Sequence, residues 1–211
     1  MGVKRTQRMS EAHAANWYDG KDFSSDWTSW HFPNWFSLLK KYRRRKARVL
    51  EIGSWEGRSA IFFLNFLPHS QLVCVDTFEG GEEHRTHPEA FAESLPLIEQ
   101  RFDANTSEFV DRIEKIKARS TDALSMLGVE RRRFDLAYID GGHLATEVYS
   151  DAVLTWPLIV RGGIVIFDDY LWDGMPGVYE VPKPGIDAFL GTIDGNYRIL
   201  LNDYQVAIVK T

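Results

Sequence analysis

The sequence has little cysteine and no long apolar run. Cys74 is the single cysteine among 211 residues, which excludes an intramolecular disulfide and argues against a thiolate zinc site. No stretch reaches the roughly 18 consecutive apolar residues that a membrane span needs. No apolar segment follows the basic residues of the first ten positions, so we expect no signal peptide. These absences predict a protein of the reducing cytoplasm, without a membrane partner.

The sequence also has no excess of basic residues, since the formal net charge is −5. Two basic clusters stand out, "KKYRRRKAR" at 40–48 and "RRR" at 131–133. Each cluster immediately precedes a predicted strand and therefore belongs to the amino edge of a parallel sheet. Ligands of such sheets bind at the opposite, carboxyl edge. We therefore expect solvated basic surfaces and no nucleic-acid partner.

From Arg48 onward, short apolar runs alternate with amphipathic segments, which indicates a doubly wound α/β domain with helices on both faces of a mostly parallel sheet. The predicted strands are 48–53, 71–76, 114–120, 134–140, 163–169, 197–202 and 204–210. The predicted helices are 57–67, 107–113, 120–128, 145–160 and 185–193. Only Asp203 separates the last two strands, so we expect a hairpin and an antiparallel C-terminal strand.

Two regions depart from this alternation. Residues 1–47 form an aromatic-rich segment that we expect to be helical and to act as a substrate cap or as a contact in a homo-oligomer. A helix that packs its aromatic side chains on the core explains this segment equally well. Residues 79–105 are a polar excursion, which we interpret as an inserted loop or lid.

The run "VLEIGSWEGRSA" places Gly53 and Gly57 in a turn between a strand and a helix. Glycines allow the backbone to approach a ligand closely, and the helix start presents free N–H groups. The spacing is Gly-x-x-x-Gly, which differs from the dinucleotide fingerprint. Glu51 can bind an ammonium group, and Asp76 ends the second strand where an acid accepts from ribose hydroxyls. The turn therefore predicts a ligand with a ribose and an amino-acid group, unless its glycines serve tight packing alone.

Three aspartates end two further strands. Asp140 and His143 lie in "YIDGGH", and Asp168 and Asp169 lie in "IFDDY". Carboxylates that converge at one sheet edge repel one another without a cation, and oxygen ligands favour Mg²⁺, Mn²⁺ or Ca²⁺. Such an ion would lower the pKa of a substrate hydroxyl, whose proton His143 would accept. A turn cap, an ion pair and a surface histidine are the ordinary alternatives. Adjacent strand residues point to opposite faces, so both Asp168 and Asp169 can bind one ion only if the strand bends.

The motifs "LEIGSWEGRSA" and "VDTF" resemble those of class I S-adenosylmethionine-dependent methyltransferases, over residues 48–211. The resemblance implies a seven-stranded Rossmann-like fold with S-adenosyl-L-methionine as cofactor. It implies that the methionine end lies near Glu51, Gly53, Ser54, Gly57, Ser59 and Asp140. It further implies that Asp76 holds the ribose, with Thr77 and Phe78 beside the adenosine and Ser120 beside the adenine.

The segment "DGGH…YSDAVLTWPLIVRGGIVIFDDY" is similar to the macrocin (sugar) O-methyltransferases within the metal-dependent O-methyltransferases. This resemblance implies methylation of a hydroxyl of a small molecule, a sugar or another vicinal diol. It implies Mg²⁺, with Mn²⁺ or Ca²⁺ as alternatives, on Asp140, Asp168 and Asp169, and catalytic roles for His143 and Asp140. Tyr170, Trp172 and Trp30 are candidates for the acceptor wall. The alternatives are a metal-independent methyltransferase acting on nitrogen or a macromolecule, and a non-catalytic cofactor-binding module.

Overall fold

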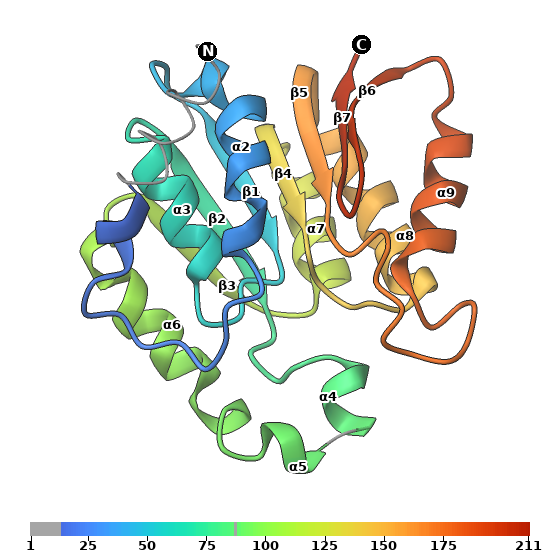
Figure 1. Ribbon diagram of the computed structural model, residues 1–211. Helices are drawn as coiled ribbons and strands as arrows, with labels where there is room; N and C mark the ends of the chain where they lie inside the picture. Colours follow the sequence, from blue (N-terminus) through green and yellow to red (C-terminus); the bar gives the residue numbers. More distant parts are fainter. Residues whose placement is uncertain (1–13, 87) are drawn as a thin grey trace, which may run out of the picture.

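The computed structural model describes residues 14–86 and 88–211. Its centre is a seven-stranded sheet with the strand order β3-β2-β1-β4-β5-β7-β6 (Figure 1). The strands are β1 (Arg48–Ile52), β2 (Gln71–Asp76), β3 (Ile113–Lys117), β4 (Phe134–Ile139), β5 (Ile159–Phe167), β6 (Tyr197–Asn202) and β7 (Val206–Lys210). The predicted doubly wound α/β fold with seven strands is therefore confirmed.

The order of the strands reverses between β1 and β4. The chain runs outward from β1 through β2 to β3, and then returns to β4, which pairs with the free side of β1. All pairs from β3 to β5 are parallel. Open sheets of this kind bind ligands outside the carboxyl ends of the strands at the reversal point. The topology therefore predicts a ligand site at the carboxyl ends of β1, β2, β4 and β5.

The C-terminal strand enters the sheet antiparallel to its neighbours. β7 lies between β5 and β6 and is antiparallel to both. A three-residue link joins β6 to β7, as a hairpin requires. The antiparallel C-terminal strand predicted from this short link is confirmed.

Helices cover both faces of the sheet. On one face, Trp35, Phe62 and Phe102 belong to a single apolar cluster with Tyr138 of β4. On the other face, Leu127 and Phe189 belong to a second cluster with strand side chains. The α-helices, whose arrangement Figure 1 shows, are α2 (Phe32–Leu38), α3 (Arg58–Phe66), α4 (Glu82–Thr86), α5 (Pro88–Phe91), α6 (Ile98–Thr106), α7 (Ser120–Val129), α8 (Ala145–Thr155) and α9 (Pro182–Thr192).

The described part of the N-terminal segment consists of three short 3-10 helices around α2, and some of its aromatic side chains are buried while others are exposed. The 3-10 helices η1 (Ala15–Tyr18), η2 (Ser29–His31) and η3 (Lys40–Tyr42) flank α2, while η5 (Ser107–Phe109) follows α6. Trp35 and Phe32 are buried against Phe62, so part of the segment packs on the core as the simpler interpretation expected. Trp27 and Trp30 remain exposed. Residues 1–13 of the predicted 1–47 segment lie outside the described residues.

The second half of the predicted excursion 79–105 forms a helix that belongs to the body of the domain. The 3-10 helix η4 (Leu95–Leu97) leads into α6, which contacts α3 and buries Ile98 and Phe102. These two residues are four apart and therefore share one helix face. The remainder carries α4 and α5, which extend from one end of the molecule in Figure 1.

Other element boundaries also needed correction. The predicted helix 107–113 is a single 3-10 turn followed by β3, which begins at Ile113 and ends at Lys117. The predicted helix 145–160 ends at Thr155, because Pro157 lies in the 3-10 helix η6 (Trp156–Leu158) and β5 begins at Ile159. Within the described residues, no helix has both the length and the apolar character to cross a bilayer. A cytoplasmic location stays a prediction.

Candidate active site

A cavity of about 920 Å³ opens at the carboxyl ends of the parallel strands. It is lined by the turns that follow β1, β2, β3, β4 and β5, together with residues of the N-terminal segment and of α4 and α5. Ten of the predicted site residues line it: Gly53, Ser54, Ser59, Asp76, Thr77, Ser120, Asp140, His143, Asp168 and Asp169. Most of the candidates that sequence reasoning selected are therefore brought together.

The two turn glycines are required by neighbouring protein atoms. Gly53 and Gly57 both adopt positive φ, +80° and +86°. A Cβ on Gly53 would lie 1.8 Å from the carbonyl oxygen of Asp140, and one on Gly57 would lie 3.0 Å from the Thr106 side chain. Gly53 therefore allows β1 and β4 to end side by side at the cavity, whereas Gly57 caps α3 outside the lining. The predicted close approach of a ligand to these glycines stays a prediction, and of the two only Gly53 lines the cavity.

Glu51 does not reach the cavity. It is fully buried in register with Cys74 and Tyr138, on the sheet face that α3 covers. Its Oε2 accepts hydrogen bonds from the Ser54 hydroxyl (2.7 Å) and the Cys74 thiol (3.2 Å). Burial raises the pKa of Glu51 to about 6, against the opposing effect of these donors. Strand alternation turns Glu51 away from the cavity lining and toward Ser54, and its contact with an ammonium group stays a prediction.

Asp76 shapes the turn that Gly53 begins. Its Oδ2 accepts from the backbone N–H groups of Ser54 (2.7 Å) and Trp55 (2.8 Å), and its Oδ1 accepts from that of Phe78 (2.6 Å). Burial raises its pKa, although these donors favour the charged form. Phe78 itself is buried against Phe102, with ring centroids 5.1 Å apart, and does not line the cavity. Its left-handed backbone turns the ring into the core.

One hydroxyl joins two of the three aspartates. Tyr138 of β4 donates to Oδ2 of Asp140 at 2.8 Å and forms a short hydrogen bond to Oδ2 of Asp168. A hydroxyl has one proton, so it cannot satisfy two carboxylates at once. Burial, followed by the charges of Asp168 and Asp169, raises the pKa of Asp140 well above its ordinary value. The pair therefore requires a further proton or a cation.

The third aspartate turns away from the strand direction. β5 ends at Phe167, and Asp169 has a φ of +56°. Adjacent strand residues point to opposite faces, so Asp168 and Asp169 can face one site only if the chain bends between them. The positive φ of Asp169 provides this bend. Asp169 accepts a hydrogen bond from Tyr204 at 2.9 Å, and its Oδ2 lies 3.1 Å from Nε2 of His143. Although burial alone opposes the charge, the contact with His143 lowers the pKa of Asp169.

The donor set fits a divalent cation. Ligand atoms of Asp140, His143 and Asp169 all lie within 4.8 Å of one another. Asp168 lines the same cavity, next to Asp140 through their shared tyrosine. Carboxylate oxygens suit Mg²⁺ or Mn²⁺, and a cation would relieve the repulsion that raises the pKa of Asp140.

Sequence reasoning missed several buried polar residues around this cavity. His31, Tyr138 and Tyr204 contact the aspartates, and Asp151 of α8 lines the cavity. Asp151 lies on the apolar face of α8, and a charged residue in such a position is the one feature of the sequence that could have indicated a buried polar residue. His31 and Tyr138 look like ordinary members of an aromatic segment and of a core strand.

Aromatic side chains close one side of the cavity. Trp27 packs against Trp55, His84 and Phe91, with ring centroids 5.4 to 6.4 Å apart. Trp30 and Trp172, two of the candidates for the acceptor wall, also line the cavity. Residues of the N-terminal segment and of the 79–105 excursion thus meet above the strand ends.

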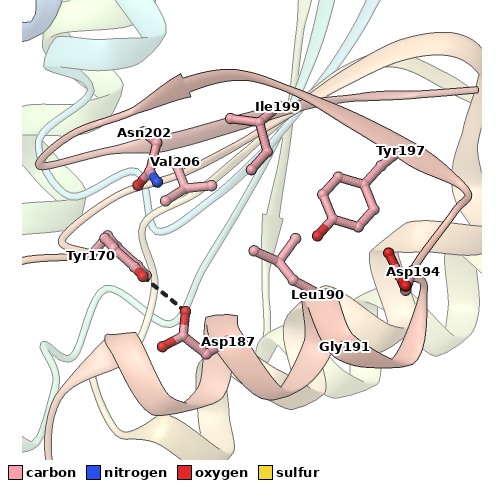
Figure 2. A pocket seen from close by; sticks show the side chains of 9 residues that line it. All are labelled: Tyr170, Asp187, Leu190, Gly191, Asp194, Tyr197, Ile199, Asn202 and Val206. Carbon is pink, nitrogen blue, oxygen red and sulfur yellow. Dashed lines mark hydrogen bonds between the residues drawn. The ribbon is translucent and has the colours of Figure 1, made fainter.

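Tyr170, the third candidate for that wall, belongs to a different hollow. Figure 2 shows this hollow of about 400 Å³, lined by residues of α9 and the C-terminal hairpin. There the Tyr170 hydroxyl donates to Asp187 at 2.9 Å. None of the predicted cofactor or metal residues lines this hollow, so the larger cavity is the candidate active site.

Comparison with known proteins points to the same cavity. The family described as "Methyltransferase domain" matches residues 50–170, which include the Gly53 turn and all three aspartates. Mycinamicin VI 2''-O-methyltransferase of Micromonospora griseorubida is 25% identical over 158 residues. That match covers 70% of this chain and 34% of the relative, so the chain spans about a third of the relative's length.

Solved structures share the fold. MycE methyltransferase from the mycinamycin biosynthetic pathway, in complex with Mg, SAH and mycinamycin VI, aligns with a TM-score of 0.63 at 20% identity, covering 88% of this chain and 50% of that chain. An O-methyltransferase from Bacillus cereus in complex with SAH aligns with a TM-score of 0.63 at 18% identity, covering 100% and 91%. At these identities the likeness establishes the fold.

Proposed function

The chain belongs to the methyltransferase-domain family, and from this premise we propose that it is a divalent-metal-dependent O-methyltransferase. It would use S-adenosyl-L-methionine to methylate a hydroxyl of a small molecule. The observation that carries the proposal is that Asp140, His143 and Asp169 share one cavity with the Gly53 turn and Asp76. A cation site and a nucleoside site in one cavity can bring a substrate oxygen to a methyl donor.

The residues that would hold the cofactor are Gly53, Ser54, Ser59, Asp76, Thr77, Ser120 and Asp140. Bound there, S-adenosyl-L-methionine supplies a methyl group that its sulfonium already activates. Glu51 supports this set from below through Ser54, and Gly57 sets the start of α3. Phe78 braces the Asp76 turn through its backbone N–H.

The residues that would hold the divalent cation are Asp140, Asp169 and Asp168. Bound there, Mg²⁺ acts as a Lewis acid toward substrate oxygens and lowers the pKa of a hydroxyl. Tyr138 keeps Asp140 and Asp168 close together, and Tyr204 fixes Asp169 from the other side. Mn²⁺ and Ca²⁺ satisfy the same oxygen-rich donor set.

His143 is the general base of the proposal. It lines the cavity three residues after Asp140, and Asp169 orients it through the 3.1 Å contact to Nε2. Trp172 packs against the imidazole, with ring centroids 4.7 Å apart, and limits its rotation. A hydroxyl that loses its proton to His143 becomes the nucleophile toward the methyl group.

The acceptor class follows from the cavity walls and from the relatives. The aromatic faces of Trp27, Trp30 and Trp172 suit the flat apolar faces of a sugar ring, and two adjacent hydroxyls suit one cation. The relative named as a 2''-O-methyltransferase of mycinamicin VI supports a small-molecule hydroxyl. Residues 14–47 would act as a substrate cap and residues 79–97 as a lid; a homo-oligomer contact is the alternative role of the first segment.

Calorimetry separates this proposal from the other activities of the fold. S-adenosyl-L-methionine is titrated into the protein in a chelator and again in Mg²⁺, and Mg²⁺ is titrated into the cofactor complex. The proposal expects both ligands to bind, with Asp169→Asn losing Mg²⁺ alone and Asp187→Asn, in the other hollow, losing neither. Cofactor binding without any cation binding would instead indicate a metal-independent methyltransferase. Absence of cofactor binding would contradict the proposal as a whole.

A further inference from the structure

A buried carboxylate of the Gly53 turn takes no part in the proposed chemistry. Glu56 has 1% of its surface exposed and does not line the cavity. Its Oε2 accepts a hydrogen bond from the backbone N–H of Ser24 at 2.6 Å, and its Oε1 accepts one from the guanidinium group of Arg101 at 2.8 Å. Both oxygens therefore bind other segments of the chain, one in the N-terminal segment and the other in α6.

The same three segments are joined by Asn105 of α6. Its side-chain amide donates to the carbonyl oxygen of Asp22 at 2.7 Å and to that of Glu56 at 3.0 Å. Its Oδ1 accepts a hydrogen bond from the backbone N–H of Asp22 at 2.9 Å. Arg101 adds an ion pair with the Asp22 carboxylate at 2.9 Å. Because Glu56 and Asn105 are both buried, water competes little for these hydrogen bonds.

Residues 22–31 form a strap that runs from this attachment along the cavity. Trp27 of the strap meets Trp55 of the Gly53 turn and His84 of α4, with ring centroids 5.4 and 6.3 Å apart. The strap ends at His31, whose Nε2 lies 3.3 Å from Oδ1 of Asp168. It therefore forms one wall of the cavity and is held by a buried contact at each end. The strap residues in the cavity lining are Phe23, Ser25, Asp26, Trp27, Thr28 and Trp30.

Side-chain contacts, and not a backbone ladder, hold the strap in place. Within it, only Ser29–His31 form a regular element, the 3-10 helix η2. Arg58 donates to Asp26 at 2.6 Å in the middle of the strap, but Asp26 is exposed, and exposed ion pairs contribute little. Segments with few backbone hydrogen bonds open at a low free-energy cost. The buried hydrogen bonds to the Glu56 carboxylate are charge-assisted, so they control how often this end of the strap opens.

We propose that the strap is a gate for the nucleoside cofactor and that Glu56 is the positioning residue that holds this gate closed. The inference rests on the proposed function, because it requires the cofactor to bind between the Gly53 turn and the strap. Glu56 is outside the cavity lining, so its contacts stabilise the closed strap equally with and without a ligand. A looser gate therefore accelerates entry and exit alike, and the affinity hardly changes. A residue that only supports the bound ligand changes the dissociation rate and the affinity together.

Stopped-flow fluorescence tests the gate, because Trp27, Trp30 and Trp55 line the cavity and can report binding. S-adenosylhomocysteine is mixed with wild type and with Glu56→Gln, a variant that keeps the size of the side chain and removes its charge. The association and dissociation rate constants are each expected to rise about 10-fold, which is the effect of one weakened hydrogen bond to a charged group. The Kd is expected to stay within about threefold of the wild-type value.

A neighbouring acid of α6 provides the matched control. Asp103 is exposed and contacts Lys115, away from the strap. Asp103→Asn removes one carboxylate charge from the same helix that binds the strap. Both rate constants of this variant are expected to equal those of wild type.

The outcomes distinguish this inference from the proposed function. Unchanged rate constants in Glu56→Gln, or faster dissociation with a proportional loss of affinity, overturn the gate and leave the proposed function standing. Wild type that does not bind S-adenosylhomocysteine overturns both. If Glu56→Gln does not fold, Arg101→Gln weakens the same attachment from its other side. The same rise in both rate constants is expected from that variant, and its absence overturns the gate.

Discussion

The Nε2 atom of His31 lies 3.3 Å from Oδ1 of Asp168, and both side chains are buried. The imidazole also packs near Trp35 and Tyr204, with ring centroids 6.0 and 5.7 Å away. The other carboxylate oxygen of Asp168 is in hydrogen-bonding contact with the Tyr138 hydroxyl, which Asp140 shares. A residue of the N-terminal segment and a residue of β4 therefore hold the end of β5 from two sides.

Replacing His31 by alanine is expected to weaken this junction. Asp168 loses a buried partner, and we expect the free energy of unfolding to fall by about 1–3 kcal/mol, with weaker Mg²⁺ binding as a second effect. Denaturant titration and Mg²⁺ calorimetry measure the two changes. His69→Ala, at an exposed histidine, is the control. Equal stability and equal Mg²⁺ affinity in His31→Ala would show that the contact has no role.

His143→Ala is expected to separate chemistry from cofactor binding. Loss of a general base lowers the rate of methyl transfer by about 10²–10⁴-fold, whereas the affinity for S-adenosylhomocysteine should stay at the wild-type value. The assay measures release of S-adenosylhomocysteine with a panel of glycosides and vicinal diols as acceptors. Retained turnover in His143→Ala, beside a normal His69→Ala, would remove His143 as the base.

Asp140→Asn is expected to remove a repulsive buried charge and a cation ligand together. The raised pKa of Asp140 means that this group stabilises the wild type at low pH and ceases to do so as pH rises through that pKa. In a chelator, the stability of Asp140→Asn relative to wild type should therefore increase with pH. Saturating Mg²⁺ should raise the melting temperature of wild type and of Asp187→Asn, but not that of Asp140→Asn. A Mg²⁺ response in Asp140→Asn would exclude this carboxylate as a ligand.

The pH dependence of stability can also be compared between wild type and Asp151→Asn, a variant at a residue outside the proposed cation ligands. The pKa of Asp151 rises from an ordinary 3.8 to about 7 on burial, so wild type loses stability as pH increases from 4 to 7. Asparagine does not titrate, and the unfolding free energy of the variant should gain on wild type over this range by at most about 4 kcal/mol. Denaturant titrations at several pH values without ligand test this. A constant difference would mean that Asp151 is paired in solution.

Much of the site could be predicted because parallel strands end at one edge of the sheet. This rule alone brings Gly53, Asp76, Asp140 and Asp169 into one cavity. It does not report which face a strand residue takes, so Glu51 was expected at the ligand although strand alternation buries it beside Cys74. The rule also gives no information on which distant segments of the chain pack against one another.

Two contacts show why the remainder needed the folded chain. His31 and Asp168 are far apart in the sequence, and their contact depends on how the N-terminal segment lies across β5. The helix α6 was hidden because its exposed face is highly charged, while only two of its four buried residues, Ile98 and Phe102, are apolar. Such features depend on tertiary packing, which outweighs the local pattern.

The central claim is that one cavity holds a nucleoside cofactor and a divalent cation side by side. A crystal structure of the protein with S-adenosylhomocysteine and Mn²⁺, with the metal located by anomalous diffraction, tests it most directly. The account predicts the nucleoside between the Gly53 turn and Ser120, and one anomalous peak between Asp140 and Asp169. A bound nucleoside with no anomalous peak at these carboxylates would contradict it.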